Sequence, residues 1–261
     1  MIVVRAVVFI FILCGLVLPC ADGIAGTLNK AQTPQTGKFS LGCYGEFVND
    51  RNLAQVDRAA SAEELRSAEL NGMRVLLKPS YAINDLIEVY AQAGIVKNDI
   101  STQGYVGGVY KTPYSITFDP DLSYGAGVKL NSDIDNVWFV GADVQFLLAD
   151  DSAKVVKNPA GNMTEYIYRS STLFEWQAAV YGARRLDMFI AYGGVKYFDS
   201  TLEMTGATGQ PDINFAADTN FGIFVGVDIP IDMTGEEDWT TSLELIFADE
   251  LSFGVGFKYG F

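Results

Sequence analysis

The chain ends with the sequence Ser252-Phe253-Gly254-Val255-Gly256-Phe257-Lys258-Tyr259-Gly260-Phe261. Every odd position of this segment is large and apolar or aromatic, and every even position is small or charged. Successive side chains of a β-strand point to opposite faces, so a strand here has one continuous apolar face and one face of glycine and Lys258. The segment therefore predicts an amphipathic strand.

The same period-two alternation recurs along the chain before this segment. We predict about ten strands, each of about 9 to 12 residues, which is the length that a tilted strand needs to cross a bilayer. They cover residues 38–48, 71–82, 86–96, 121–131, 137–148, 172–182, 187–198, 219–229, 239–248 and 251–261.

The predicted connections alternate between short and long. Short turns are expected near 83–85, 132–136, 183–186 and 230–238. The intervening connections at 49–70, 97–120, 149–171 and 199–218 have about 20 residues, and only the last of this series, at 249–250, is short. Short turns at one end and long loops at the other are typical of a barrel inserted into a membrane from the periplasm. The predicted fold is therefore an all-β, single transmembrane antiparallel up-and-down β-barrel of about ten strands, with eight as the alternative count.

The N-terminus has the layout of a secretory signal: Arg5, an apolar run over residues 6–18, and then small residues. We expect a signal peptide at 1–25, a periplasmic leader at 26–37 and an outer-membrane barrel at 38–261. Lipidation of Cys20 stays open. If the signal is removed, Cys43 is expected to remain as a lone thiol.

Aromatic residues near the predicted strand ends suggest two girdles at the membrane interfaces. The girdle at the short-turn end would contain Tyr81, Trp138, Trp239, Tyr259 and Phe261, and the girdle at the long-loop end Phe47, Phe146, Tyr197, Phe221 and Phe247.

The terminal alternation also carries a resemblance to a known family. Phe253, Val255, Phe257, Tyr259 and Phe261 are similar to the C-terminal signal that the outer-membrane assembly machinery of Gram-negative bacteria recognises. The chain as a whole resembles small outer-membrane barrels of the OmpA-like and opacity-porin type. This resemblance implies export across the inner membrane, insertion of a closed barrel into the outer membrane, and outer-membrane lipid and the assembly machinery as partners.

Composition excludes several classes of function. A net charge of −14, from 32 acidic and 18 basic residues, would repel nucleic acid. With no histidine in the chain, there is no histidine-based catalytic pair and no histidine-ligated metal. Three cysteines cannot form a four-thiolate metal site. We therefore predict a non-enzymatic protein with no catalytic, cofactor or metal site.

The inward face of the predicted strands carries charges of both signs. In a barrel of about ten strands these charges should pair across a narrow interior, because an isolated ion there costs several kcal/mol. The expectation is a plugged or very narrow lumen. The predicted lumen charges are Glu46, Arg74, Lys78, Glu88, Lys129, Asp143, Glu175, Lys196, Asp228, Glu244 and Lys258.

The leading functional hypothesis is an integral outer-membrane barrel with a structural role in the envelope and long surface loops. One alternative is a small porin or narrow channel for ions or small solutes, since the same charges could line a selective constriction. Another is an adhesin or recognition protein whose loops bind surface ligands. A soluble lipocalin-like barrel, with its apolar stripe turned inward, fits the same period. The sequence does not identify a solute, a ligand or the oligomeric state.

Overall fold

The computed structural model describes residues 37–56, 64–106, 109–152, 155–157, 166–206, 212–218, 220–231, 238–247 and 251–260. Within these ranges the chain forms thirteen β-strands and no helix. The predicted signal peptide and Cys20 lie outside the described residues, as does the predicted leader apart from Gly37.

Ten of the strands close into one barrel in which every neighbouring pair is antiparallel. The seam joins the last strand to the first, from Ser40 opposite Gly260 to Asn49 opposite Leu251. The predicted ten-stranded antiparallel up-and-down barrel is confirmed. Its strands are β1 (Phe39–Gln55), β2 (Glu64–Ala82), β3 (Ile87–Val106), β5 (Asp121–Asp133), β6 (Trp138–Ser152), β8 (Tyr166–Arg185), β9 (Ile190–Gly206), β11 (Phe221–Ile231), β12 (Asp238–Phe247) and β13 (Leu251–Gly260).

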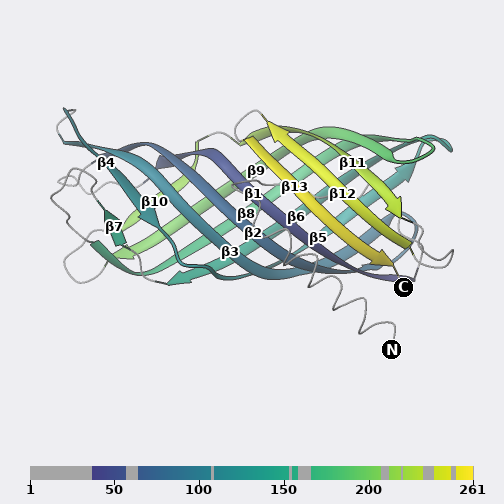
Figure 1. The fold of residues 1–261 in the computed structure, drawn as a ribbon, viewed down its shortest axis with the longest axis horizontal. Coiled ribbons are helices and arrows are strands. Elements are labelled where there is room, and N and C mark those ends of the chain that lie inside the picture. The colour runs from purple at the N-terminus through teal and green to yellow at the C-terminus, as the bar shows by residue number, and fades with distance from the viewer. Residues whose placement is uncertain are drawn as a thin grey trace.

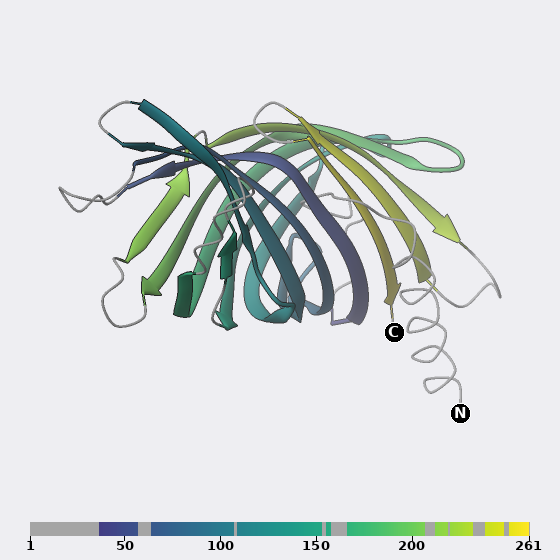
Figure 2. The ribbon, with the colours of Figure 1, turned by 60° about the vertical axis from the view of Figure 1, so that its left-hand side comes forward.

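Several strands are much longer than predicted. β1 and β9 have 17 residues, β2 has 19, and β3 and β8 have 20. Much of what was expected to be long loops at 49–70, 97–120, 149–171 and 199–218 is therefore strand, and that expectation is corrected. These stretches also contain the short strands β4 (Val109–Thr117), β7 (Val155–Lys157) and β10 (Ile213–Ala217), which gather at the end of the barrel away from the C-terminus (Figures 1 and 2).

The short strands complete a second closed ring at that end. The ring runs β1-β2-β3-β4-β7-β8-β9-β10 and returns to β1 through pairs from Leu53 opposite Ala217 to Gln55 opposite Phe215. We name this part, the described residues of 51–71, 97–118, 150–172 and 201–218, the extension. β11, β12 and β13 stop below it, so the barrel has ten strands along most of its length and eight in the extension.

In the ten-stranded part, the buried charges face inward and most of the outward side chains are apolar. Lys129 is 3% exposed and Asp228 is 0% exposed, whereas Leu122 on the outer face is 69% exposed and Val180 is 56% exposed. A soluble barrel would show the opposite distribution, because burying charge and exposing large apolar groups both cost free energy in water. This contradicts the lipocalin-like alternative.

The outward apolar side chains form a band around the barrel, which we name the apolar belt. On β11 it runs from Phe221 to Ile229. Nine residues at a rise of about 3.3 Å, tilted by about 40°, cover about 20 Å of membrane thickness, and a bacterial barrel has an apolar band of about 25 Å. The belt is therefore of the height that a membrane-spanning barrel needs.

Where the extension begins, the apolar side chains change from the outward face of the strand to the inward face. On β3, Ile95 faces outward and is 52% exposed, but five residues later Ile100 faces inward and is fully buried, while the outward neighbour Ser101 is polar and exposed. The extension thus has an apolar interior and a polar outer face, like a barrel in water. A cluster that we name the apolar plug fills this interior and the adjoining end of the ten-stranded part: Val48, Leu53, Ala68, Leu70, Val96, Ile100, Ile116, Phe118, Ala149, Leu173, Leu202, Met204 and Phe215.

Most of the predicted girdle aromatics face outward on the belt. At the short-turn end, Tyr81 and Trp138 are exposed, and the rings of Trp239 and Tyr259 stack with their centroids 4.8 Å apart. At the other end, the exposed aromatic residues are Phe146, Tyr197, Phe221 and Phe247. Phe47 differs: it is only 3% exposed, with Met73 and Phe253 opposite it on the two neighbouring strands. Phe261 lies outside the described residues.

Cys43 is disulfide-bonded in the structure of the full chain. The expectation of a lone thiol concerns the chain after removal of the signal peptide, so it stays a prediction.

Candidate functional site

The candidate site is the lumen, meaning the interior of the ten-stranded part of the barrel. All eleven charges predicted for it lie on the inward face, although they form more than one group. Eight are buried: Arg74, Glu88, Lys129, Asp143, Glu175, Lys196, Asp228 and Glu244. The other three, Glu46, Lys78 and Lys258, are half-buried.

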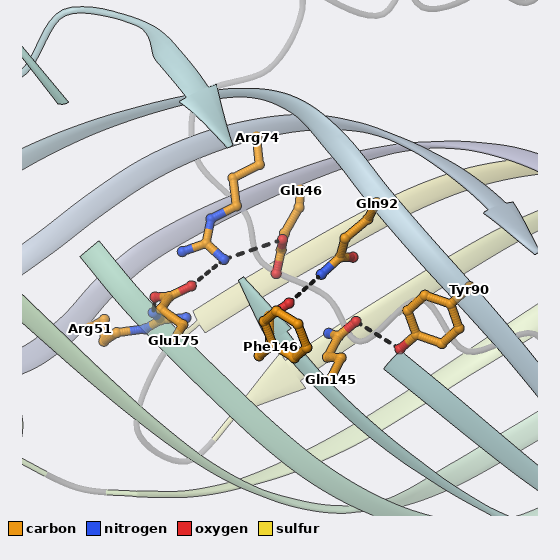
Figure 3. Close-up of polar contacts among 8 residues, drawn as sticks. All are labelled: Glu46, Arg51, Arg74, Tyr90, Gln92, Gln145, Phe146 and Glu175. Carbon is orange, nitrogen blue, oxygen red and sulfur yellow. Dashed lines mark hydrogen bonds and ion pairs between the residues drawn. The ribbon is translucent and has the colours of Figure 1, made fainter. Parts of the chain in front are cut away.

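One group of lumen charges lies directly below the apolar plug and is centred on Glu175 of β8. Arg51 of β1 and Arg74 of β2 each contact a different carboxylate oxygen of Glu175 (Figure 3). Arg74 also lies 3.6 Å from Glu46, measured from Nη1 to Oε2. The guanidinium group of Arg51 also lies 5.0 Å from the centre of the Phe198 ring, a cation–π distance. Two arginines from one wall are thereby tied to a carboxylate on the opposite wall.

Arg51 is a buried charge of the lumen that sequence reasoning missed. The pairing of β1 with β2 shifts register between Val48 and Arg51, and Asp50 within this bulge has a φ of 57°. A bulge inserts residues into one strand and so reverses which positions face inward beyond it. Extending the period-two pattern from Glu46 and Val48 therefore directs Arg51 outward. The signal that could have found it is Asn49-Asp50, because these residue types tolerate a positive φ.

A second group lies nearer the short turns. Lys258 donates to Glu88 with Nζ and Oε1 2.7 Å apart. The hydroxyl of Tyr90 donates toward Asp143 at 2.7 Å and Gln145 at 2.9 Å, and Lys78 Nζ lies 3.4 Å from the centre of the Tyr90 ring. These contacts join side chains of β2, β3, β6 and β13 across the lumen.

Three tyrosines pack across the lumen wall in the same way. Each lies over a glycine directly opposite it on the neighbouring strand, where an added Cβ would come within 2.2 to 2.4 Å of the ring. The hydroxyl of each tyrosine then reaches the strand beyond the glycine. The three sets are Tyr90 with Gly127 and Asp143, Tyr181 with Gly141 and Asn131, and Tyr192 with Gly226 and Glu244.

The lumen is filled at both levels. Toward the short turns, Tyr181 and Tyr192 join Phe139, Phe224 and Ile246 in a second buried apolar cluster. Between this cluster and the apolar plug, the cavity bordered by the Glu175 group measures about 50 Å³.

The described residues offer no group of three or more His, Cys, Asp or Glu side chains that could hold a metal ion. Within the same part of the chain, no helix is long and apolar enough to cross a membrane. The proposed assembly-signal residues Phe253, Val255, Phe257 and Tyr259 lie on β13, half-buried on the outward face of the strand, and Phe261 falls outside the described residues.

No protein-family model matches this chain. No curated protein matches it either.

Among solved structures, the chain is similar to the translocator domain of the autotransporter NalP from Neisseria meningitidis, with 7% identity and a TM-score of 0.49 over 88% of this chain and 90% of that one. It is also similar to the β-domain of the Bordetella autotransporter BrkA, with 10% identity and a TM-score of 0.44 over 87% and 99%. A third is the COG4313 outer-membrane channel from Pseudomonas putida F1, with 12% identity and a TM-score of 0.41 over 90% and 98%. Likeness of this degree does not bring the activity of those proteins to this chain.

Proposed function

We propose that this protein is an integral outer-membrane β-barrel with a closed lumen, without enzymatic activity, that contributes to the structure of the envelope. Its partners would be outer-membrane lipid and the outer-membrane assembly machinery. The observation that carries the proposal is the apolar plug, in which Val48, Ile100 and Phe215 are fully buried inside the barrel wall.

The apolar belt supports membrane insertion. Large apolar side chains such as Leu122, Val144 and Val180 are each more than half exposed on the outer face, and Asp143 is 1% exposed on the inner face of the same wall. Hydrocarbon is the solvent in which exposed apolar groups and inward charges are both favourable, and a closed barrel leaves no unpaired strand edge in it. The C-terminal alternation and the short turns at one end support an outer-membrane location.

The packed lumen supports a structural role over a porin. A diffusion pore needs a continuous water-filled path, but here the plug blocks one end, ion pairs cross the middle, and the Tyr181–Tyr192 cluster fills the other end. Ions would have to pass through close-packed side chains, for which opening a path costs several broken contacts.

Single-channel recording tests this proposal. Refolded protein, first shown to be inserted by its heat-modifiable migration on denaturing gels and by co-sedimentation with vesicles, is added to a planar bilayer. We expect no discrete conductance steps. A variant that lacks residues 212–218, and with them β10 and Phe215 of the plug, is the comparison that should conduct if it remains inserted. Regular steps from the unaltered protein would contradict the closed lumen and favour the channel alternative.

A recognition role is the second candidate, supported by the extension. The extension holds polar outward side chains such as Ser101, Gln103 and Glu203 on a closed β-frame beyond the apolar belt. Rigid frames suit surface recognition because little entropy is lost on binding. If this role is correct, substitutions of these outward residues will abolish cell-surface binding and leave heat-modifiable migration intact.

A further inference from the structure

A groove with a volume of about 750 Å³ lies on the outer surface of the barrel within the apolar belt. Its lining is almost entirely apolar, and its volume is within the range of about 300–1,000 Å³ that ligand sites occupy. It lies toward the short turns and crosses β5, β6, β8 and β9. The outward side chains that border it are Leu130, Val140, Ala142, Val180 and Val195.

The floor of the groove is made of small residues on adjacent strands. Gly182 of β8 is directly opposite Gly193 of β9 on one side and Val140 of β6 on the other. An added Cβ at Gly182 would meet nothing within 4 Å, whereas at the inward Gly141 it would lie 2.2 Å from the ring of Tyr181. Packing inside the chain therefore explains Gly141 but not Gly182. Glycine within a strand is unfavourable, and it often marks a place where another molecule approaches closely.

A cation stands at the end of the groove nearest the short turns. Arg184 follows Gly182 on the same outward face of β8, about 7 Å further along the strand. Its guanidinium group lies 5.3 Å from the centre of the Trp138 ring. Its neighbour Arg185 pairs with Asp133 at 2.7 Å, but among the described residues Arg184 has no acidic partner. An exposed arginine held by an aromatic ring at the membrane interface is well placed to bind a phosphate.

We propose that this groove is a binding site for one anionic phospholipid of the leaflet on the short-turn side, with an acyl chain along Gly182 and Gly193 and the phosphate on Arg184. The cation sits at headgroup depth and the apolar floor begins one pair of residues deeper, which is the order of chemical groups along a phospholipid. This site rests on membrane insertion of the barrel but does not depend on whether the lumen conducts.

Charge favours a lipid over a second copy of the chain as the occupant. A symmetric dimer through this face would be isologous and would place the same surface of each copy against the other. Arg184 of each copy would then lie at the rim of one interface, where the two like charges repel. A lipid phosphate instead supplies the missing negative charge.

Native mass spectrometry of the refolded full chain can test the site. The protein is inserted into bilayers of equal parts phosphatidylglycerol and phosphatidylcholine, and the lipids that stay bound after release are counted. We expect one retained lipid, with phosphatidylglycerol preferred by about tenfold, because the choline cation of phosphatidylcholine offsets the charge of its phosphate beside Arg184. Gly182→Leu should remove the retained lipid, and Arg184→Gln should keep one lipid but lower the preference to about onefold.

Gly45→Leu is the matched control. Gly45 of β1 is the outward partner of Val75 and Val255, and an added Cβ there also meets nothing within 4 Å. This variant should retain lipid as the unaltered protein does. The site is overturned if Gly182→Leu retains as much lipid as Gly45→Leu, if Arg184→Gln leaves the preference unchanged, or if the unaltered protein appears as a dimer without lipid. Failure of all variants to show heat-modifiable migration would instead overturn membrane insertion itself.

Discussion

Arg51 on β1 crosses the lumen to contact Glu175 on β8, 124 positions further along the chain. In the ring of ten strands β1 and β8 are on opposite sides, so this ion pair joins walls that share no backbone hydrogen bond. Arg74 of β2 contacts the other oxygen of the same carboxylate. One glutamate therefore holds two buried cations.

Glu175→Gln should strongly destabilise the barrel. The substitution removes the carboxylate charge that the buried Arg51 and Arg74 share, although Arg74 keeps Glu46 at 3.6 Å. Breaking a buried pair in this way costs about 3–5 kcal/mol. Urea unfolding in lipid vesicles, followed by tryptophan fluorescence, would measure it. Glu203→Gln, an exposed position on β9, is the control and should leave the midpoint unchanged. Equal midpoints for both variants would show that the Glu175 group adds no stability.

Gly127→Val should destabilise the wall beneath Tyr90. An added Cβ at Gly127 lies 2.4 Å from the ring of Tyr90, so the ring must move and release its hydrogen bond to Asp143. Overpacking of this kind costs about 1–3 kcal/mol. The same unfolding assay on Gly45→Val, where the added side chain meets open space, is the comparison. A Gly127→Val midpoint as high as that of Gly45→Val would argue against this packing of Tyr90.

Phe215→Ala should loosen the extension. Phe215 is fully buried in the apolar plug, and a Phe→Ala change in a core costs about 3–5 kcal/mol. Because β10 is held by three residue pairs to β1 and four to β9, we expect proteolytic cleavage near 199–218 to accelerate while the ten-stranded part stays resistant. Ser101→Ala, on the outer face of the extension, should be cleaved as slowly as the unaltered protein.

Spin labels should locate the water boundary between Ile95 and Ser101. Labels at Val144 and Val225, on the apolar belt, should collide with oxygen and be protected from a water-soluble nickel complex. Labels at Ser101 and Glu203, on the extension, should show the reverse, because the outward face there is polar and exposed. If the labels at Ser101 and Val144 respond alike, the change of the outer face from apolar to polar does not mark the edge of the membrane.

Asp135 should stabilise the turn between β5 and β6 in a pH-dependent way. Its carboxylate accepts hydrogen bonds from the backbone of Trp138 at 2.6 Å and Val137 at 2.7 Å, which lower its pKa below the ordinary value of 3.8. A lowered folded-state pKa gives stability that is fully present above the ordinary value and lost as pH falls through the folded value.

The difference in unfolding free energy between the unaltered protein and Asp135→Ala should therefore be constant above about pH 5 and shrink as the pH falls below 3.8. Asp187→Ala, in the turn between β8 and β9, serves as the control. A difference that grows toward low pH would have the wrong sign for this account.

The ten-stranded part could be predicted from sequence because its outer face meets lipid. On β13, the apolar stripe from Phe253 to Tyr259 predicts both the strand and the face of it that points outward. The extension could not be found by the same rule. Beyond Val96 the outer face becomes polar and the apolar residues turn inward, so a search for outward apolar stripes ends each strand at the belt and reads the remainder as loop.

The inward position of the lumen charges could also be predicted because the outer face meets lipid, and again only within the ten-stranded part. Asp143, Asp228 and Glu244 each alternate with outward apolar residues, so period two places them inward. Their partners were not predictable, because a contact such as Lys258 with Glu88 depends on which strands meet across the lumen. The inward position of Arg51 was not predicted, because a bulge inserts a residue before it and the period-two pattern does not show such an insertion.

The edge of β1 that closes the barrel is divided between two partner strands. Residues Ser40–Asn49 pair with β13, and residues Leu53–Gln55 pair with β10, which precedes β13 in the chain. During assembly β10 could therefore join β1 before β13 does, and so close the extension while the wall below is still open at the seam between β1 and β13. Such a premature closure would trap an eight-stranded intermediate, and the bulge at Asp50, which separates the two halves of the edge, is the place where biogenesis would have to keep them apart.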